Sequence, residues 1–92
     1  MNIIHVKGFK KGDVLLFALS TCGWCKKTRE LLEDIGVEYS YVYVDLLEGS
    51  EREDAVNQLK RWNPQLSLPT LVLNQERIII GFDKESILGA LG

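Results

Sequence analysis

Apolar and polar positions divide the chain into segments of strand length and of helix length. The run from Asp13 to Ser20 is almost continuously apolar, as in a strand buried on both faces of a sheet. Residues 37–45 are rich in Val and Tyr and predict a second strand, on which Tyr39, Tyr41 and Tyr43 share one face and serve packing. Two apolar runs, 70–73 and 77–80, are separated by three polar residues and predict a hairpin.

Helix-forming residues fill the intervals between the first three strands and follow the hairpin. The first helix begins at the cysteine pair, Cys22 and Cys25, and Gly36 ends it. The last helix follows Asp83, whose side chain is suited to cap it. The order β-α-β-α-β-β-α therefore predicts an α/β core with a parallel first half and a terminal hairpin.

The middle helix, Ser50 to Trp62, has the clearest local signals. Ser50 and Glu53 have the spacing of a capping box, in which each side chain bonds the backbone N–H of the other residue. Ala55, Leu59 and Trp62 recur on one face, so we expect Trp62 in the core rather than in contact with a substrate.

The chain is 92 residues long, which predicts one small domain over 1–92 with its core at 13–91. Residues 1–12 form an N-terminal extension, in which 3–6 is a candidate for a short edge strand. His5, the sole histidine, lies in this extension and matches no catalytic motif, so we expect it at the surface.

Composition indicates a soluble globular protein, with 46% hydrophobic and 26% charged residues. The longest apolar stretch, Val14 to Leu19, is too short to cross a bilayer, and the first residues lack the layout of a signal peptide. We therefore expect a cytoplasmic protein with no membrane partner. In that compartment a close cysteine pair is more often catalytic or metal-binding than a structural disulfide.

The net charge of −2 conceals an uneven distribution. Residues 1–29 carry six Lys or Arg against Asp13 alone, whereas residues 30–58 carry nine acids against Arg52 alone. The cysteines thus lie in a basic segment. We expect its positive charge to lower the pKa of a nearby thiol and to attract acidic partners. The basic residues are too few, and too poor in neighbouring aromatic residues, to predict a nucleic-acid partner.

The motif Cys22-Gly23-Trp24-Cys25 carries the candidate chemistry. Two thiols at positions i and i+3 can close a disulfide across one helical turn, and a sulfur at a helix N-terminus meets unpaired N–H groups that favour its thiolate. We expect Cys22 to be the nucleophile, Cys25 to resolve the mixed disulfide, and Lys26 and Lys27 to stabilise the thiolate. A cysteine pair of this spacing by itself is also compatible with a zinc site.

Four stretches, in order along residues 13–91, together resemble the glutaredoxin family. They are Ser20-Thr21-Cys22-Gly23-Trp24-Cys25, KKTRELLEDIGVEYSYVYVD, Ser67-Leu68-Pro69-Thr70 and Ile80-Gly81-Phe82-Asp83. The Trp inside the cysteine motif, together with VDLLEG, is similar to small glutaredoxin-like redoxins of archaea. The resemblance implies a thioredoxin fold with a four-stranded mixed sheet and helices on both faces.

The resemblance also implies a function. The expected activity is thiol–disulfide exchange on protein or low-molecular-weight disulfides, by a monomer without a tightly bound cofactor or metal. A cis Leu68–Pro69 bond is expected to face the dithiol and expose the backbone of Leu68 to an extended substrate. The other expected substrate contacts are Thr21, Gly23, Trp24, Gly81, Phe82 and Asp83, with the last three at the γ-glutamyl end of glutathione.

Two positions depart from the family pattern and leave the electron donor open. Phe82 stands where glutaredoxins usually have a second glycine, and Leu19 stands where they often carry a lysine. Both changes weaken a glutathione site, and Gly-Phe is more similar to redoxins reduced by a flavoprotein reductase. A glutathione-like thiol and such a reductase therefore both remain candidate donors.

Two other functions are compatible with the fold. Cys22 could serve in an iron–sulfur cluster bridged between subunits, although two cysteines supply only part of a ligand set. A redox-inert binding module is the second, and the intact dithiol with Pro69 argues against it.

Overall fold

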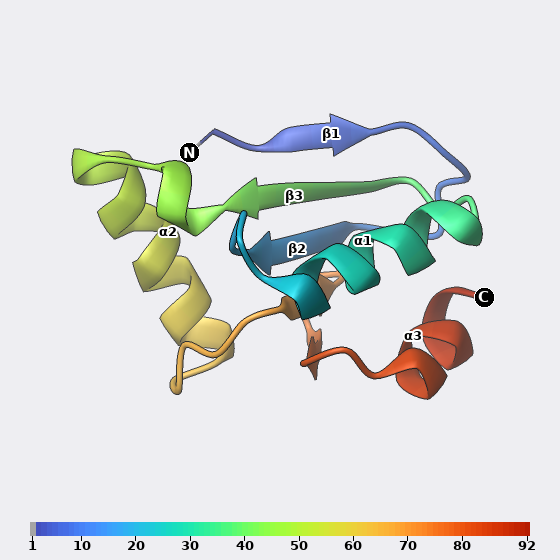
Figure 1. Ribbon diagram of the computed structural model, residues 1–92. Coiled ribbons are helices and arrows are strands. Elements are labelled where there is room, and N and C mark those ends of the chain that lie inside the picture. Colours follow the sequence, from blue (N-terminus) through green and yellow to red (C-terminus); the bar gives the residue numbers. More distant parts are fainter. Residues whose placement is uncertain (1) are drawn as a thin grey trace.

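A computed structural model describes residues 2–92 and contains one mixed five-stranded sheet with three α-helices (Figure 1). The strands are β1 (Ile4–Val6), β2 (Val14–Ala18), β3 (Tyr39–Tyr43), β4 (Thr70–Leu73) and β5 (Arg77–Ile80). The helices are α1 (Gly23–Asp34), α2 (Gly49–Trp62) and α3 (Lys84–Leu91), and a short 3-10 helix, η1, spans Val44–Leu46. None of these helices is long and apolar enough to span a membrane.

The sheet has the strand order β1-β3-β2-β4-β5. β2 lies at its centre, parallel to β3 and antiparallel to β4, and the predicted hairpin forms β4 and β5 at one edge. The prediction of four strands is wrong by one, because the candidate edge strand in the N-terminal extension pairs antiparallel with β3. This pairing covers the edge of β3, whose N–H and C=O groups would otherwise face solvent.

Helices cover both faces of the sheet, as the thioredoxin fold requires. Cys25 and Leu32 of α1 and Ile87 of α3 pack in one apolar cluster with alternate residues of the central strands. Ala55 and Leu59 of α2 pack in a second cluster with the intervening residues. Because successive strand residues point to opposite faces, the apolar run at β2 contributes to both clusters, as its continuous hydrophobicity predicts.

The end of α1 and the start of α2 differ in how well the neighbouring sequence predicts them. α1 ends as expected, with Gly36 at a positive φ of 73°. The capping-box prediction is wrong: α2 begins at Gly49 with Glu48 as its N-cap, and no side chain caps it. Gly49, the first residue of α2, takes a positive φ of 58°, which glycine adopts without the strain of a side chain.

Arg29 of α1 contacts three tyrosines of β3 and so connects the helix to the sheet. Its guanidinium lies 3.9 Å from the centroid of the Tyr41 ring and donates hydrogen bonds to the hydroxyls of Tyr39 (3.1 Å) and Tyr43 (2.8 Å). The hydroxyl of Tyr39 in turn donates to the carboxylate of Glu33. The three tyrosines therefore share one face and serve packing, as predicted.

Two other expectations about single residues are confirmed. Trp62 packs, partly buried, against the apolar cluster under α2. His5 is exposed on β1, where it bonds Ser40 on the neighbouring strand (3.1 Å) and pairs with Glu38 (3.3 Å). His5 thus helps to attach the extension to β3.

Candidate active site

The two cysteines lie where the central strand passes into α1. Cys22 is the N-cap residue of the helix, and the backbone N–H of Cys25 donates a hydrogen bond to the sulfur of Cys22 across 3.2 Å. Both cysteines are free thiols. Cys22 is partly exposed, whereas Cys25 is 1% exposed. The geometry therefore presents one sulfur to solvent and keeps the other one turn inside the helix.

The surroundings of Cys25 hold it in the protonated form. Burial raises the pKa of the Cys25 thiol to about 12, and the hydrogen bond to Cys22 and the negative charge of Asp45 act in the same direction. At neutral pH Cys25 is a thiol. The more accessible Cys22 is thus the better placed of the two to react first.

Asp45 is a site residue that the sequence analysis did not identify. It follows β3, and its carboxylate accepts hydrogen bonds from the backbone N–H (2.9 Å) and the hydroxyl of Ser20. These bonds hold the pKa of Asp45 below its usual value. Because β2 and β3 are parallel, their carboxyl ends lie at the same edge of the sheet, which brings Asp45 next to Ser20. The bonds from Ser20 to Asp45 hold the loop that leads into Cys22.

The loop before β4 reaches the same edge. The Leu68–Pro69 peptide bond is cis. Leu68 and Pro69 line one pocket with Trp24, so the loop lies next to the cysteine motif. The backbone N–H of Gly81 donates to the carbonyl of Pro69 across 2.8 Å and joins the end of β5 to this loop.

Asn63, the C-cap residue of α2, anchors this loop. Its side chain is buried, at 2% exposure. Its Nδ2 donates to the carbonyl (3.1 Å) and hydroxyl (2.9 Å) of Ser67 and to Oγ1 of Thr70 (3.1 Å). An asparagine at the end of a helix has no distinctive pattern, so only the folded loop reveals this role.

An apolar pocket of about 270 Å³ adjoins the dithiol. Its lining residues come from α1, the loop before β4 and the segment after β5: Trp24, Leu68, Pro69, Gly81 and Phe82. The rings of Trp24 and Phe82 stack with centroids 5.8 Å apart and an angle of 22° between their planes. Trp24 is 60% exposed, so most of its side chain is accessible at the surface.

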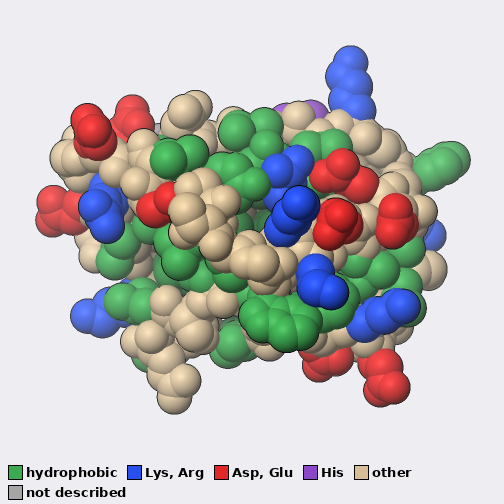
Figure 2. All heavy atoms as spheres, in the orientation of Figure 1, with side chains coloured by type: hydrophobic (Ala, Val, Ile, Leu, Met, Phe, Trp, Pro, Cys, Tyr) green, Lys and Arg blue, Asp and Glu red, His purple; other side chains and the backbone are tan. Residues whose placement is uncertain are grey.

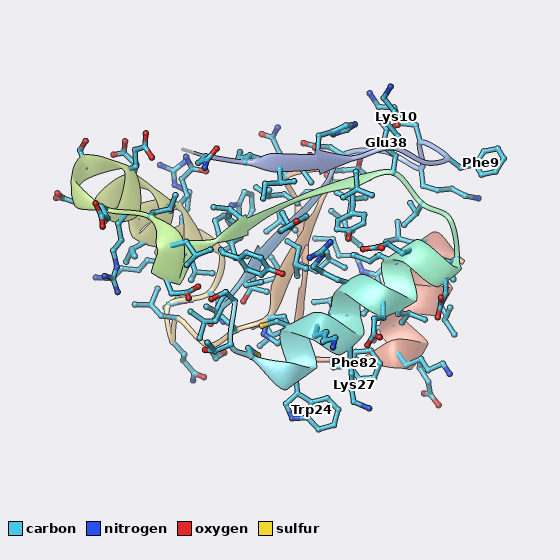
Figure 3. The ribbon with its side chains drawn as sticks, turned by 45° about the horizontal axis from the view of Figure 1, so that its top comes forward. Phe9, Lys10, Trp24, Lys27, Glu38 and Phe82 are labelled. Carbon is cyan, nitrogen blue, oxygen red and sulfur yellow. The ribbon has the colours of Figure 1, made fainter. Side chains whose placement is uncertain are left out.

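Of the two lysines that follow the cysteine motif, Lys27 contacts a residue of this pocket. Lys27 places its Nζ 5.6 Å from the centroid of the Trp24 ring, so its ammonium group lies against the aromatic face (Figure 3). Hydrophobic and basic side chains meet over the start of α1 (Figure 2). Lys26, Thr21 and Gly23 are exposed nearby in the chain, and a Cβ built at Gly23 would meet no described atom within 4 Å.

Asp83 caps α3, as predicted. One carboxylate oxygen accepts from the backbone N–H of Ser86 (3.1 Å) and the other from its hydroxyl (2.7 Å). These bonds lower the pKa of Asp83. Both oxygens are already engaged before any ligand binds.

Metal ligands are sparse in the described part of the chain. Residues 2–92 contain no group of three or more His, Cys, Asp or Glu side chains placed to hold a metal ion. A cluster at Cys22 would therefore need ligands from a second chain or from free thiols.

Comparisons with known proteins agree with this geometry. The family model described as glutaredoxin matches residues 14–78. The chain is 49% identical to the glutaredoxin from Methanosarcina mazei Go1, covering 100% of this chain and 89% of that one, with a TM-score of 0.91. It is 49% identical to methanoredoxin from Methanosarcina acetivorans, covering 92% and 90% of the two chains, with a TM-score of 0.89.

A bacterial relative extends the comparison. An uncharacterised glutaredoxin-like 8.6 kDa protein of the rubredoxin operon of Clostridium pasteurianum is 27% identical over 74 residues, or 80% of this chain and 91% of that protein. The matched region contains the dithiol and the loop before β4. This chain belongs to the glutaredoxin family.

Proposed function

We propose that this protein is a thiol–disulfide oxidoreductase that reduces disulfides by cycling Cys22 and Cys25 between dithiol and disulfide. One observation carries the proposal: an accessible sulfur caps α1, and a buried thiol lies one turn inside the same helix. That arrangement separates an attacking sulfur from a resolving one.

The reaction divides into two exchanges. The thiolate of Cys22 attacks one sulfur of the substrate disulfide, the S–S bond breaks, and the leaving sulfur takes up a proton. Cys25 then loses its proton and attacks the sulfur of Cys22, which releases the second substrate thiol and leaves a Cys22–Cys25 disulfide. Two electrons pass to the substrate, and a two-electron donor must return them.

The substrates in this proposal are protein or low-molecular-weight disulfides, met by a cytoplasmic monomer without a tightly bound cofactor. The donor is a low-molecular-weight thiol or a flavoprotein reductase. The position of Leu68 in one pocket with Trp24 supports contact with an extended substrate. Trp24, at the mouth of the pocket, supplies an apolar contact surface.

The test is a pair of serine substitutions assayed on a protein disulfide, such as insulin, with dithiothreitol as reductant. Cys22→Ser is expected to abolish turnover. Cys25→Ser is expected to accumulate a mixed disulfide at Cys22, visible as added mass under non-reducing conditions. Full turnover by Cys22→Ser would contradict the assignment, and a wild-type protein that accelerates no reduction would favour an inert binding module.

A further inference from the structure

We propose that Trp24, Phe82 and Lys27 select polypeptide disulfides whose cysteine is flanked by a bulky apolar residue and an acidic residue. The proposal rests on the disulfide exchange proposed at Cys22 and names the substrate that the same site prefers. Three observations carry it: the size of the pocket, the occupied carboxylate beside it, and the position of one ammonium group.

The pocket has the size and lining of a site for one large side chain. Its volume of about 270 Å³ lies just below the range of about 300–1,000 Å³ that holds whole small-molecule ligands. Its five lining residues are uncharged, and two of them form a stacked aromatic pair. An apolar side chain next to the reacting cysteine would displace water from this surface and gain contact with both rings.

A zwitterionic small thiol finds less to bind at this place. Each oxygen of Asp83 already accepts one hydrogen bond from Ser86, so only its remaining lone pairs are open to an ammonium group. Gly81 and Phe82 line this part of the pocket, and the Phe82 ring stacks on Trp24. An apolar side chain in the pocket needs no contact with Asp83 and leaves the cap of α3 unchanged.

Charges of both signs lie beside the pocket: the Asp83 carboxylate follows Phe82, and the ammonium group of Lys27 lies at Trp24. The Nζ of Lys27 lies over the Trp24 ring, and Trp24 stacks on Phe82, so the cation marks one end of an aromatic surface (Figure 3). An acidic residue adjacent to the buried apolar one can reach this ammonium group. The contact is solvent-exposed, so added salt weakens it.

The experiment uses the full chain, reduced and freed of reductant, in single-turnover reactions with four matched peptide disulfides. The peptides carry Phe or Ala next to the cysteine, each combined with Glu or Gln at the following position. We expect the Phe peptides to react about 10-fold faster than the Ala peptides, the scale on which a hydrophobic pocket discriminates. We expect Glu to add about 2- to 5-fold over Gln at low salt, and this gain to vanish at about 0.5 M salt.

Three variants separate the contributions. Phe82→Ala is expected to reduce the Phe-over-Ala ratio to below about 3-fold, because one wall of the pocket is lost. Lys27→Gln is expected to remove the Glu-over-Gln ratio and keep the apolar preference. Phe9→Ala, which removes an aromatic side chain that is 78% exposed and far from Trp24, is the matched control and is expected to keep both ratios (Figure 3).

Two further substrates distinguish failure of this inference from failure of the proposed function. Equal rates for the four peptides, or a faster reaction with glutathione disulfide than with the Phe-Glu peptide, would overturn the selectivity. 2-Hydroxyethyl disulfide has neither an apolar nor an acidic side chain. If the selectivity fails and this disulfide is still reduced, the proposed oxidoreductase function stands. A wild-type protein that reduces none of these disulfides would overturn both.

Discussion

The sulfur of Cys22 accepts the first backbone hydrogen bond of α1, from the N–H of Cys25 at 3.2 Å. The residue expected to react is therefore also the cap of the helix that carries it. Cys25 lies below it, buried and protonated. Several properties of the reduced protein follow from this division between an outer and an inner sulfur.

Alkylation should distinguish the two thiols. In reduced protein at pH 7, we expect iodoacetamide to modify Cys22 and leave Cys25 intact, because Cys25 is 1% exposed and its pKa is raised to about 12. Mass spectrometry of proteolytic fragments measures both sites. Denaturant should make the two cysteines equally reactive, and equal rates in native protein would contradict the assignment of an inner sulfur.

Stability of the reduced protein should fall at alkaline pH. The pKa of Cys25 is higher in the folded chain than in the unfolded one, where it is near its ordinary value. The contribution of Cys25 to the free energy of unfolding is thus complete below about pH 8.5 and is lost as pH rises toward about 12, by up to about 1.4 kcal/mol per pH unit. Urea unfolding between pH 7 and 10.5 measures this slope.

Cys25→Ser tests the origin of that slope. The variant should show a shallower decline in the free energy of unfolding than the wild type over the same pH range. A residual slope is expected, since burial also raises the pKa of Tyr39 above its usual value. An unchanged slope would assign the effect to Tyr39 alone.

Asp45→Asn should make Cys25 easier to ionise. The carboxylate contributes a negative charge that raises the Cys25 pKa, and asparagine keeps the shape without the charge. The pH dependence of Cys25 alkylation, measured in a Cys22→Ser background, should move to lower pH. Ser20→Ala is the matched control, because it removes a hydroxyl bonded to Asp45 and retains the charge; an equal shift in both variants would indicate a loosened loop instead.

Arg29→Met should lower the free energy of unfolding by about 2–4 kcal/mol. The substitution removes donors to the hydroxyls of Tyr39 and Tyr43 and the cation above Tyr41, and leaves partly buried polar groups without their partner. Chemical denaturation measures the change. Arg77→Met on the exposed face of β5 should change stability by less than about 0.5 kcal/mol.

Asn63→Ala should loosen the loop that carries Pro69. It deletes a buried side chain with three donor contacts, for an expected loss of about 2–3 kcal/mol. The KM for a peptide disulfide should rise more than kcat falls, because the proposed role of this loop is to bind the substrate and not to react with it. Gln65→Ala, at an exposed position of the same loop, should leave both constants unchanged.

The sequence predicted those elements whose boundaries depend on residues a few positions apart. The hairpin strands β4 and β5 have the predicted boundaries, because their apolar runs flank a turn in which Asn74 and Gln75 both take positive φ. The helix stop at Gly36 and the cap at Asp83 are equally short-range. The glutaredoxin resemblance located the dithiol and the residues that line the pocket beside it.

The remaining features depend on contacts between distant segments. Ser20 and Asp45 meet because β2 and β3 are parallel, and neither residue has a local pattern that names the other. β1 forms by antiparallel pairing with β3, which lies far from it in the sequence. The spacing of Ser50 and Glu53 matched the capping rule, but α2 starts at Gly49, and no side chain caps it.

The cap on α1 links folding to redox chemistry through a thermodynamic cycle. Closing a Cys22–Cys25 bond alters the sulfur that accepts the first amide of the helix, so the dithiol and disulfide forms differ in their free energy of unfolding. That difference equals the amount by which folding displaces the dithiol–disulfide equilibrium from its value in the unfolded chain. A substitution that strengthens the cap in one form alone thus shifts the reducing power of the protein by the same free energy, even if it touches neither substrate nor donor.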